Sequence, residues 1–240
     1  MTAVINATKI KGNLAWYQGS NPKRLVDAIG PDVYKILEDF VYSPQVAATN
    51  FSVGWTITLV GASTIRLADA VGGAVLITTA AAENDGVSAQ IIGESFELTA
   101  DQHVFFGMYG ITINDATQTD FFAGLAITDT AILGGVTDRI GFECLDGVLD
   151  LLFMLEKDSV ETSTDTTINI ADATPFDIEF YWNGDAGTIE AFVNGVSVAT
   201  PVTTNLPNDE FLRPSIEFLT GEAVANTFQA DKLVIIGIGR

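Results

Sequence analysis

Apolar and polar residues alternate in short runs along most of the chain, most clearly between residues 175 and 199. Every second residue from Phe176 to Trp182 is aromatic or aliphatic, which is the period of a strand with one face in a core. Asn194-Gly195 then separates two further alternating runs, and this pair favours a tight hairpin because both residues tolerate positive φ. The stretch therefore predicts an antiparallel meander of strands.

The same pattern recurs from about residue 51 to the end of the chain. Short apolar runs follow one another, separated by Gly and by Asn or Asp turns such as Asp146-Gly147. Many short strands with tight turns are typical of two packed sheets, because each sheet covers the apolar face of the other. We therefore predict a mainly β protein with a two-sheet antiparallel β-sandwich domain over residues 46–240.

Residues 1–45 depart from this pattern and are predicted to form a separate N-terminal segment. Residues 1–20 show no clean period and favour a short arm or an edge strand. Asn21-Pro22 matches a helix start, with Asn as the cap and Pro in the first turn, and apolar residues then recur on one helical face. We predict two short helices, over about 22–29 and 32–40.

The chain of 240 residues has a net charge of −20, and this charge is unevenly distributed. Residues 1–40 hold five basic and four acidic side chains, whereas the rest of the chain holds 6 basic and 27 acidic ones. An acidic body repels nucleic acid and anionic membranes, so we expect neither as a partner.

The N-terminal segment combines cations with aromatic residues, which are the types enriched in protein interfaces. It therefore predicts a docking or oligomer interface, and the alternative is that the segment simply packs against the sandwich. The candidate interface residues are Lys9, Lys11, Trp16, Tyr17, Lys23 and Arg24.

The inventory of reactive side chains is small. Cys144 and His103 are the only residues of their kinds, which leaves no intrachain disulfide, no zinc ligand set and little basis for a catalytic triad. Calcium stays open because turn oxygens can bind it, but no Asp-x-Asp-x-Asp-Gly spacing occurs, and we predict no cofactor. The turn residues concerned are Asn183, Asp185, Asp129 and Asp158.

Asp177 and Glu179 are the pair to test for a glycosidase site in such a sandwich. Glycosidases need two carboxylates a fixed distance apart across the sugar. These two residues share a strand face, but they lack the Glu-x-Asp-x-x-Glu spacing of laminarinase-like enzymes. A solvent-facing acidic strand is the favoured interpretation.

Several stretches resemble known families. Residues 176–199, with an aromatic strand, a Gly turn and a strand ending in Asn-Gly, resemble the hairpin of concanavalin A-like and laminin-G-like jelly-roll sandwiches. Together with this hairpin, residues 115–133, 138–143, 156–158 and 207–218 look like virion structural proteins of tailed bacteriophages. The resemblance spans roughly residues 100–235 and implies a capsid decoration protein with a lectin-like jelly roll.

The first functional interpretation is a non-enzymatic decoration or cement protein that binds the outside of a phage capsid and stabilises it. The expected partners are the major capsid protein and sister subunits, in a homo-oligomer for which a trimer is one option, and host-surface glycans. No targeting segment or long apolar run is visible, so we expect synthesis in the host cytoplasm and residence on the virion. A carbohydrate-binding adhesion module on the virion is the alternative, and a glycoside hydrolase is third.

Overall fold

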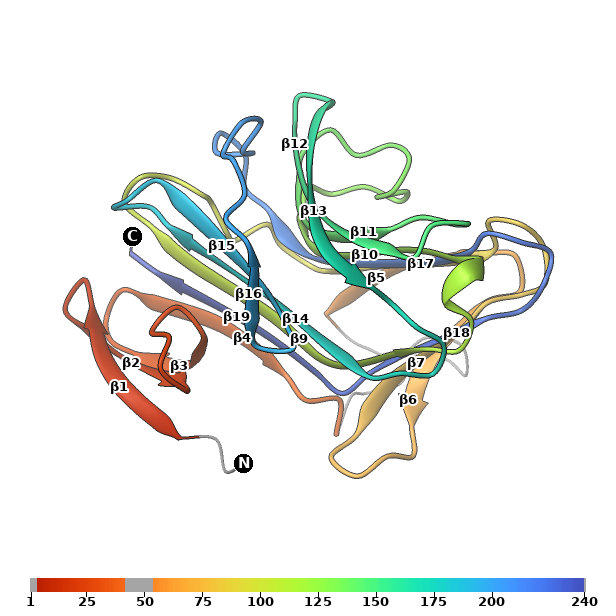
Figure 1. Ribbon diagram of the computed structural model, residues 1–240, viewed down its shortest axis with the longest axis horizontal. Coiled ribbons are helices and arrows are strands. Elements are labelled where there is room, and N and C mark those ends of the chain that lie inside the picture. The colour runs from red at the N-terminus through yellow and green to blue at the C-terminus, as the bar shows by residue number, and fades with distance from the viewer. Residues whose placement is uncertain (1–3, 42–53, 240) are drawn as a thin grey trace.

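The computed structural model describes residues 4–41 and 54–239, and almost all of its regular structure is β. Within these residues, nineteen strands and one short 3-10 turn, η1 (Ala116–Gln118), follow one another. Two large antiparallel sheets pack face to face, and a small third sheet lies beside them (Figure 1). The predicted two-sheet sandwich is therefore confirmed.

The first large sheet has seven strands in the order β13-β12-β11-β10-β17-β8-β5. All neighbours in this seven-stranded sheet are antiparallel. Its strands are β5 (Trp55–Val60), β8 (Gly86–Ile91), β10 (Thr119–Ala126), β11 (Arg139–Cys144), β12 (Asp150–Lys157), β13 (Val160–Asn169) and β17 (Arg213–Thr220).

The second sheet is built around the long strand β9 (His103–Ile113), which pairs with β14, β18 and β19. The predicted meander forms one half of it, as β14, β15 and β16 in sequence order. The other strands of this second sheet are β4 (Val33–Glu38), β6 (Thr64–Ala68), β7 (Ala74–Thr78), β14 (Phe176–Asn183), β15 (Thr188–Val193), β16 (Val196–Ala199), β18 (Thr227–Ala230) and β19 (Lys232–Ile238).

The main core lies between the two large sheets and is rich in phenylalanine. Phe106 stacks on Phe180 within the second sheet, with ring centroids 5.2 Å apart, and Phe153 of the seven-stranded sheet meets Phe180 edge-on at 5.6 Å. Because side chains alternate along each strand, the residues between these core positions point out of the sandwich. Both sheets therefore have an outer face, which further parts of the chain cover.

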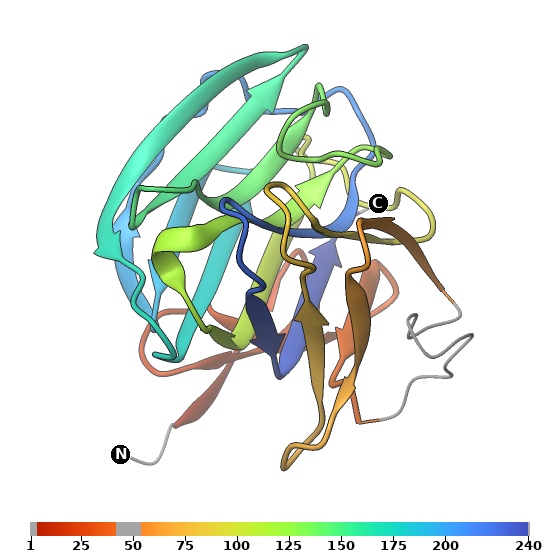
Figure 2. The ribbon, with the colours of Figure 1, turned by 90° about the vertical axis from the view of Figure 1, so that its right-hand side faces the viewer.

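The third sheet covers the outer face of the second sheet. It consists of β1 (Ile5–Ile10), β2 (Asn13–Gln18) and β3 (Leu25–Ile29). Leu25 and Ala28 of this sheet pack on Phe105, Tyr181 and Ile236. In both ribbon views the red three-stranded sheet and the green strands of the seven-stranded sheet, β11 to β13, lie on opposite sides of the second sheet (Figure 1, Figure 2).

The two predicted N-terminal helices are wrong, because residues 25–29 and 33–38 are strands β3 and β4. Of the apolar residues that suggested a helical face, Leu25 is buried as an inward position of β3, whereas Ile29 and Leu37 are exposed. A helix of about eight residues is marginal in water, whereas β2 and β19 offer open edges whose backbone groups pair with these segments along their whole length.

The pairing of β4 also bears on the predicted division of the chain at residues 45 and 46. That boundary lies outside the described residues, but β4 precedes it and is nevertheless a strand of the second sheet, hydrogen-bonded to β19. The sandwich thus draws on both ends of the chain. In the described ranges, no helix has the length and apolar character needed to cross a membrane.

Candidate functional site

Three of the six predicted interface residues bind the acidic body of the same chain. Lys11 pairs with Asp185 at 2.8 Å, Lys23 with Glu190 at 2.6 Å, and Arg24 with the buried Glu179 at 2.6 Å. The charge contrast between the N-terminal segment and the rest of the chain is thus used inside the molecule, where it fixes the third sheet onto the second.

The other three predicted interface residues lie in β1 and β2. Lys9 is exposed and has no ion pair with any described residue, whereas Trp16 and Tyr17 are half-buried and Tyr17 packs against the core beneath the third sheet. The docking role of this surface stays a prediction, and three of its four predicted cations already have partners within the chain.

Asp177 and Glu179 do not form an open carboxylate pair. Glu179 is buried and accepts hydrogen bonds from Arg24 and from the Tyr109 hydroxyl, the latter at 2.8 Å. Asp177 accepts the backbone N–H of Gly110 at 2.9 Å. Both carboxylates therefore support the second sheet and its cover.

His103 and two of the calcium candidates, Asp185 and Asp129, also have structural partners. His103 is buried and lies 2.8 Å from the Tyr181 hydroxyl and 3.1 Å from Asp185. Asp129 caps the backbone N–H groups of Thr130 and Ala131. No group of three acidic, histidine or cysteine side chains suited to a metal ion occurs among the residues that the structure describes.

An open groove, here the end groove, lies where β9 begins and β19 ends. Two adjoining cavities of about 450 and 400 Å³ share Glu97 and Gln102 in their walls. The full set of lining residues is Lys11, Asp32, Tyr34, Ser95, Glu97, Thr99, Asp101, Gln102, Phe211 and Gly239.

The wall of the end groove formed by residues 99–102 is held in place by β14. Trp182 donates its indole N–H to the Thr99 carbonyl at 2.9 Å, and the Gly184 backbone N–H bonds to the Gln102 carbonyl at 3.0 Å. A Cβ at Gly184 would lie 2.3 Å from the Gln102 carbonyl oxygen, so only glycine allows this close approach. The groove is therefore attached to a rigid strand.

The chemistry of the end groove combines an exposed aromatic ring with polar side chains. Phe211 is 54% exposed and lies beside Ser95, Glu97 and Gln102. The Tyr34 hydroxyl donates to the Gln102 side-chain oxygen, which orients the amide. Such a surface offers apolar contact from a ring face together with directional donors and acceptors, which suits a ligand with both characters.

The outer face of the seven-stranded sheet holds a second cluster, here the glutamate face: Arg139, Glu143, Glu156 and Glu217. Arg139 is 2% exposed and pairs with Glu143 at 2.6 Å and Glu156 at 2.7 Å. Its guanidinium also lies 5.4 Å from the ring centre of Phe122. Burial raises the pKa of both glutamates, and Arg139 opposes that rise.

Glu217 lies across Phe122 from Glu143. Both pair with Phe122 on neighbouring strands, so their Cα atoms lie about 10 Å apart, twice the strand spacing. Burial raises the pKa of Glu217 to about 7, although the Leu133 backbone N–H donates to it at 2.5 Å. A carboxyl group with such a pKa can give or accept a proton near neutral pH.

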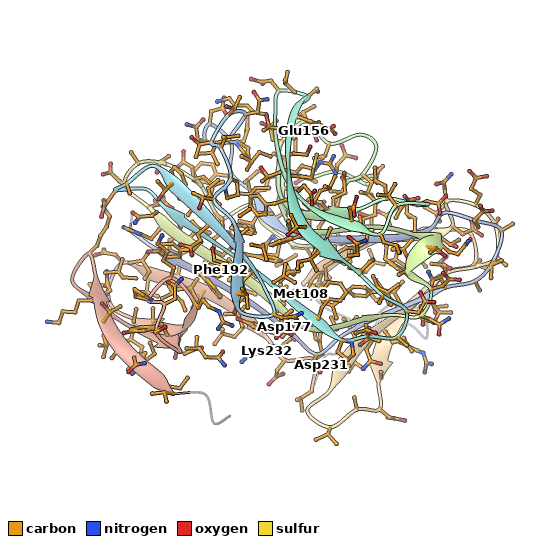
Figure 3. The ribbon with its side chains drawn as sticks, in the orientation of Figure 1. Met108, Glu156, Asp177, Phe192, Asp231 and Lys232 are labelled. Atoms are coloured by element: carbon orange, nitrogen blue, oxygen red, sulfur yellow. The ribbon has the colours of Figure 1, made fainter. Side chains whose placement is uncertain are left out.

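The segment 128–138, between β10 and β11, covers the glutamate face. Ile132 and Val136 pack on Phe122 and Ala126, and the Asp129 backbone N–H donates to the Gln90 side chain at 3.0 Å. Figure 1 shows this green loop beside β12, and Figure 3 shows Glu156 on the same side of the molecule, away from Phe192 and Asp177. The glutamates are consequently shielded from solvent.

The sequence contained one usable signal for the glutamate face. In the strand Arg139–Cys144, the residues Ile140, Phe142 and Cys144 face the core, and the first and last outward positions are charged, as Arg139 and Glu143. The end groove left no such signal, because its lining combines β4, the segment before β9 and the segment before β17.

No family profile and no curated protein matches this chain. Solved structures do share its fold. A protein of unknown function from Shewanella oneidensis MR-1 has 13% identity and a TM-score of 0.59, with 86% of this chain and 87% of that chain covered. The endo-1,3-β-glucanase from Streptomyces sioyaensis has 10% identity and a TM-score of 0.60, with 90% and 100% covered. The Emp47p carbohydrate recognition domain has 12% identity and a TM-score of 0.59, with 88% and 96% covered.

These similarities confirm the lectin-like jelly-roll sandwich. They also contradict the prediction that the protein is not an enzyme, because the solved structures that share this fold include an endo-glucanase. Nothing in these comparisons bears on the expected virion location or capsid partners.

Proposed function

We propose that the protein binds carbohydrate in the end groove. The observation that carries this proposal is the exposed ring of Phe211 beside Glu97 and Gln102 in an open cavity of about 400 Å³. A pyranose ring presents an apolar face and a rim of hydroxyl groups, and the groove offers a matching ring face and hydrogen-bonding side chains.

The fold neighbours support the same class of ligand. One of them is named as a carbohydrate recognition domain and another as a glucanase, so this sandwich is used elsewhere for glycans. This support is an analogy of fold, and the residues of the end groove supply the local argument.

A glycan array read with the purified protein tests the proposal. We expect binding to a defined subset of glycans, and Phe211→Ala should weaken it roughly tenfold, since about 1–1.5 kcal/mol of apolar contact is lost. Val224→Ala is the matched control, because Val224 is similarly exposed, at 58%, and does not line the groove. Absence of binding to any glycan, or equal binding by the Phe211 variant, would contradict the proposal.

Glycoside hydrolysis at the glutamate face is the second candidate. The raised pKa of Glu217, across Phe122 from Glu143, favours it, because glycosidases use one carboxyl group as an acid and another as a base or nucleophile. Segment 128–138 would have to move aside to admit a sugar chain. Turnover of a polysaccharide panel that Glu217→Gln abolishes would support this candidate, and turnover that survives the substitution would exclude this site.

Display of the end groove on a virion, with Lys9, Trp16 and Tyr17 docked on a capsid, is a separate proposal. Removing residues 1–40 would also remove β4 from the second sheet, so the informative variant lacks residues 1–30 only and keeps β4. Unchanged capsid occupancy by this truncated chain would contradict docking through the third sheet.

A further inference from the structure

Arg213 is a buried cation for which the described part of the chain supplies no anion. It is 9% exposed, and its buried Nε has no hydrogen-bond partner. Six other cations form ion pairs, namely Lys11, Lys23, Arg24, Lys35, Arg139 and Lys157. The remaining described cations, Lys9, Arg66 and Lys232, are exposed to solvent.

A buried guanidinium normally has a carboxylate or another acceptor beside it, because removing a charge from water is costly unless it is paired. The shortage of partners is notable in a chain with 31 acidic residues and only 11 basic ones. The Arg139 cluster, on the same outer face, has three carboxylate partners for one arginine. Arg213 therefore has the features of a group kept for an anion from outside the chain.

Arg213 is not among the residues that line the two cavities of the end groove, but it follows Phe211, which does line it, by two residues. Leu212 is buried in the main core and bridges to Phe96, so its neighbours Phe211 and Arg213 both point away from that core. Two residues along a strand span about 7 Å, which is within the length of one monosaccharide and an arginine side chain. The Ser95 backbone N–H donates to the Leu212 carbonyl at 2.9 Å and fixes this point beside the groove wall.

We propose that the end groove selects acidic glycans, with a sugar ring on Phe211 and the carboxylate of a uronic acid on Arg213. This inference rests on the proposed function and names its substrate class. A carboxylate is the anion that fits best, because the planar guanidinium fork binds a planar carboxylate through two parallel hydrogen bonds. A sulfate group offers the same charge in a tetrahedral arrangement and is the comparison to make.

The test uses matched oligosaccharides that differ at one carbon. Glucuronate-containing oligosaccharides are compared with their glucose counterparts and with glucose 6-sulfate counterparts, by titration calorimetry at physiological salt. We expect the wild-type protein to prefer the glucuronate form about tenfold, as one charge-assisted hydrogen-bond pair would give. Arg213→Gln should remove this preference and leave affinity for the glucose form unchanged. Arg213→Lys should retain part of it.

Arg66→Gln is the matched control, because it removes the same charge from an exposed arginine on β6. A preference that disappears in both variants would reflect net charge alone and would overturn the inference. Equal binding of glucuronate and glucose forms by the wild type, or a preference for sulfate over carboxylate, would also overturn it while leaving glycan binding intact. Absence of binding to every oligosaccharide would overturn both proposals.

Discussion

The two outer faces of the sandwich are both covered by the chain itself, and they are covered in different ways. The third sheet lies on the second sheet through an apolar contact that includes Leu25 and Ile236, with ion pairs such as Lys23–Glu190 at its margin. Segment 128–138 lies on the seven-stranded sheet, where a buried arginine, three glutamates and an orphan Arg213 Nε occupy the face.

The two faces therefore differ in how their charged groups are paired. Those under the third sheet have partners, whereas the face of the seven-stranded sheet keeps buried groups with a shifted pKa or without a partner. Under the third sheet, the predicted cations Lys11, Lys23 and Arg24 all meet carboxylates, and the charge pattern of the chain is accounted for. On the seven-stranded sheet, burial leaves Glu217 with a pKa near 7 and leaves Arg213 without an anion. Buried groups with a strongly shifted pKa or an unpaired charge are more frequent at functional sites than on surfaces that serve only the structure.

The largest expected effect comes from breaking the glutamate face at its centre. Arg139→Met should lower the free energy of unfolding by about 3–5 kcal/mol at pH 7, because Glu143 and Glu156 lose their buried counter-charge. The loss should shrink at pH 4, where protonated glutamates no longer need that charge. Urea unfolding of both proteins measures it, with Arg66→Met as the control. A loss under 1 kcal/mol would mean that the segment 128–138 does not seal this face.

The next largest effect is the dependence of stability on pH through Glu217 of the glutamate face. Burial raises the pKa of Glu217 from 4.5 to about 7, so the folded protein holds this proton more tightly than the unfolded chain. The contribution of this proton to the free energy of unfolding is therefore complete below pH 4.5 and is lost as the pH rises towards 7 and beyond. The whole contribution amounts to about 3 kcal/mol.

Glu217→Gln isolates this contribution, because glutamine stays neutral and its side-chain oxygen can still accept the Leu133 N–H. We expect the variant and the wild type to have similar stability at pH 4, and the variant to be more stable at pH 8. Unfolding midpoints in urea at the two pH values provide the measurement. A difference between variant and wild type that does not change with pH would show that Glu217 titrates normally.

The sequence was most informative for the meander, where apolar and polar residues alternate clearly and the paired strands lie close together along the chain. The hairpins of β14, β15 and β16 followed from alternation and from Asn194-Gly195, whose φ values of 51° and 73° are positive as the turn requires. The prediction of a helix over the β4 segment is wrong because the strand that pairs with β4 is β19, at the other end of the chain. Local periodicity carries no information about such a partner.

The candidate sites depend on the same long-range pairing. Glu143 and Glu217 face each other across Phe122 only because β10 lies between β11 and β17 in a fixed register. The end groove likewise combines β4, the segment before β9 and the segment before β17. Residue types at these positions are ordinary in sequence, so their chemistry emerges only when the sheets form.

The smallest effect tests the margin of the third sheet. Lys23→Met removes the ion pair with Glu190, whose pKa is lowered by Lys23 against the opposing effect of partial burial. Lys23 is 36% exposed, so the loss in unfolding free energy should be at most about 1 kcal/mol and should vanish in high salt. It should also vanish as the pH falls below the pKa of Glu190, where the carboxylate is protonated. Lys9→Met is the control for charge alone. A loss of several kcal/mol would mean that ion pairs, rather than the apolar contact beneath, hold the third sheet in place.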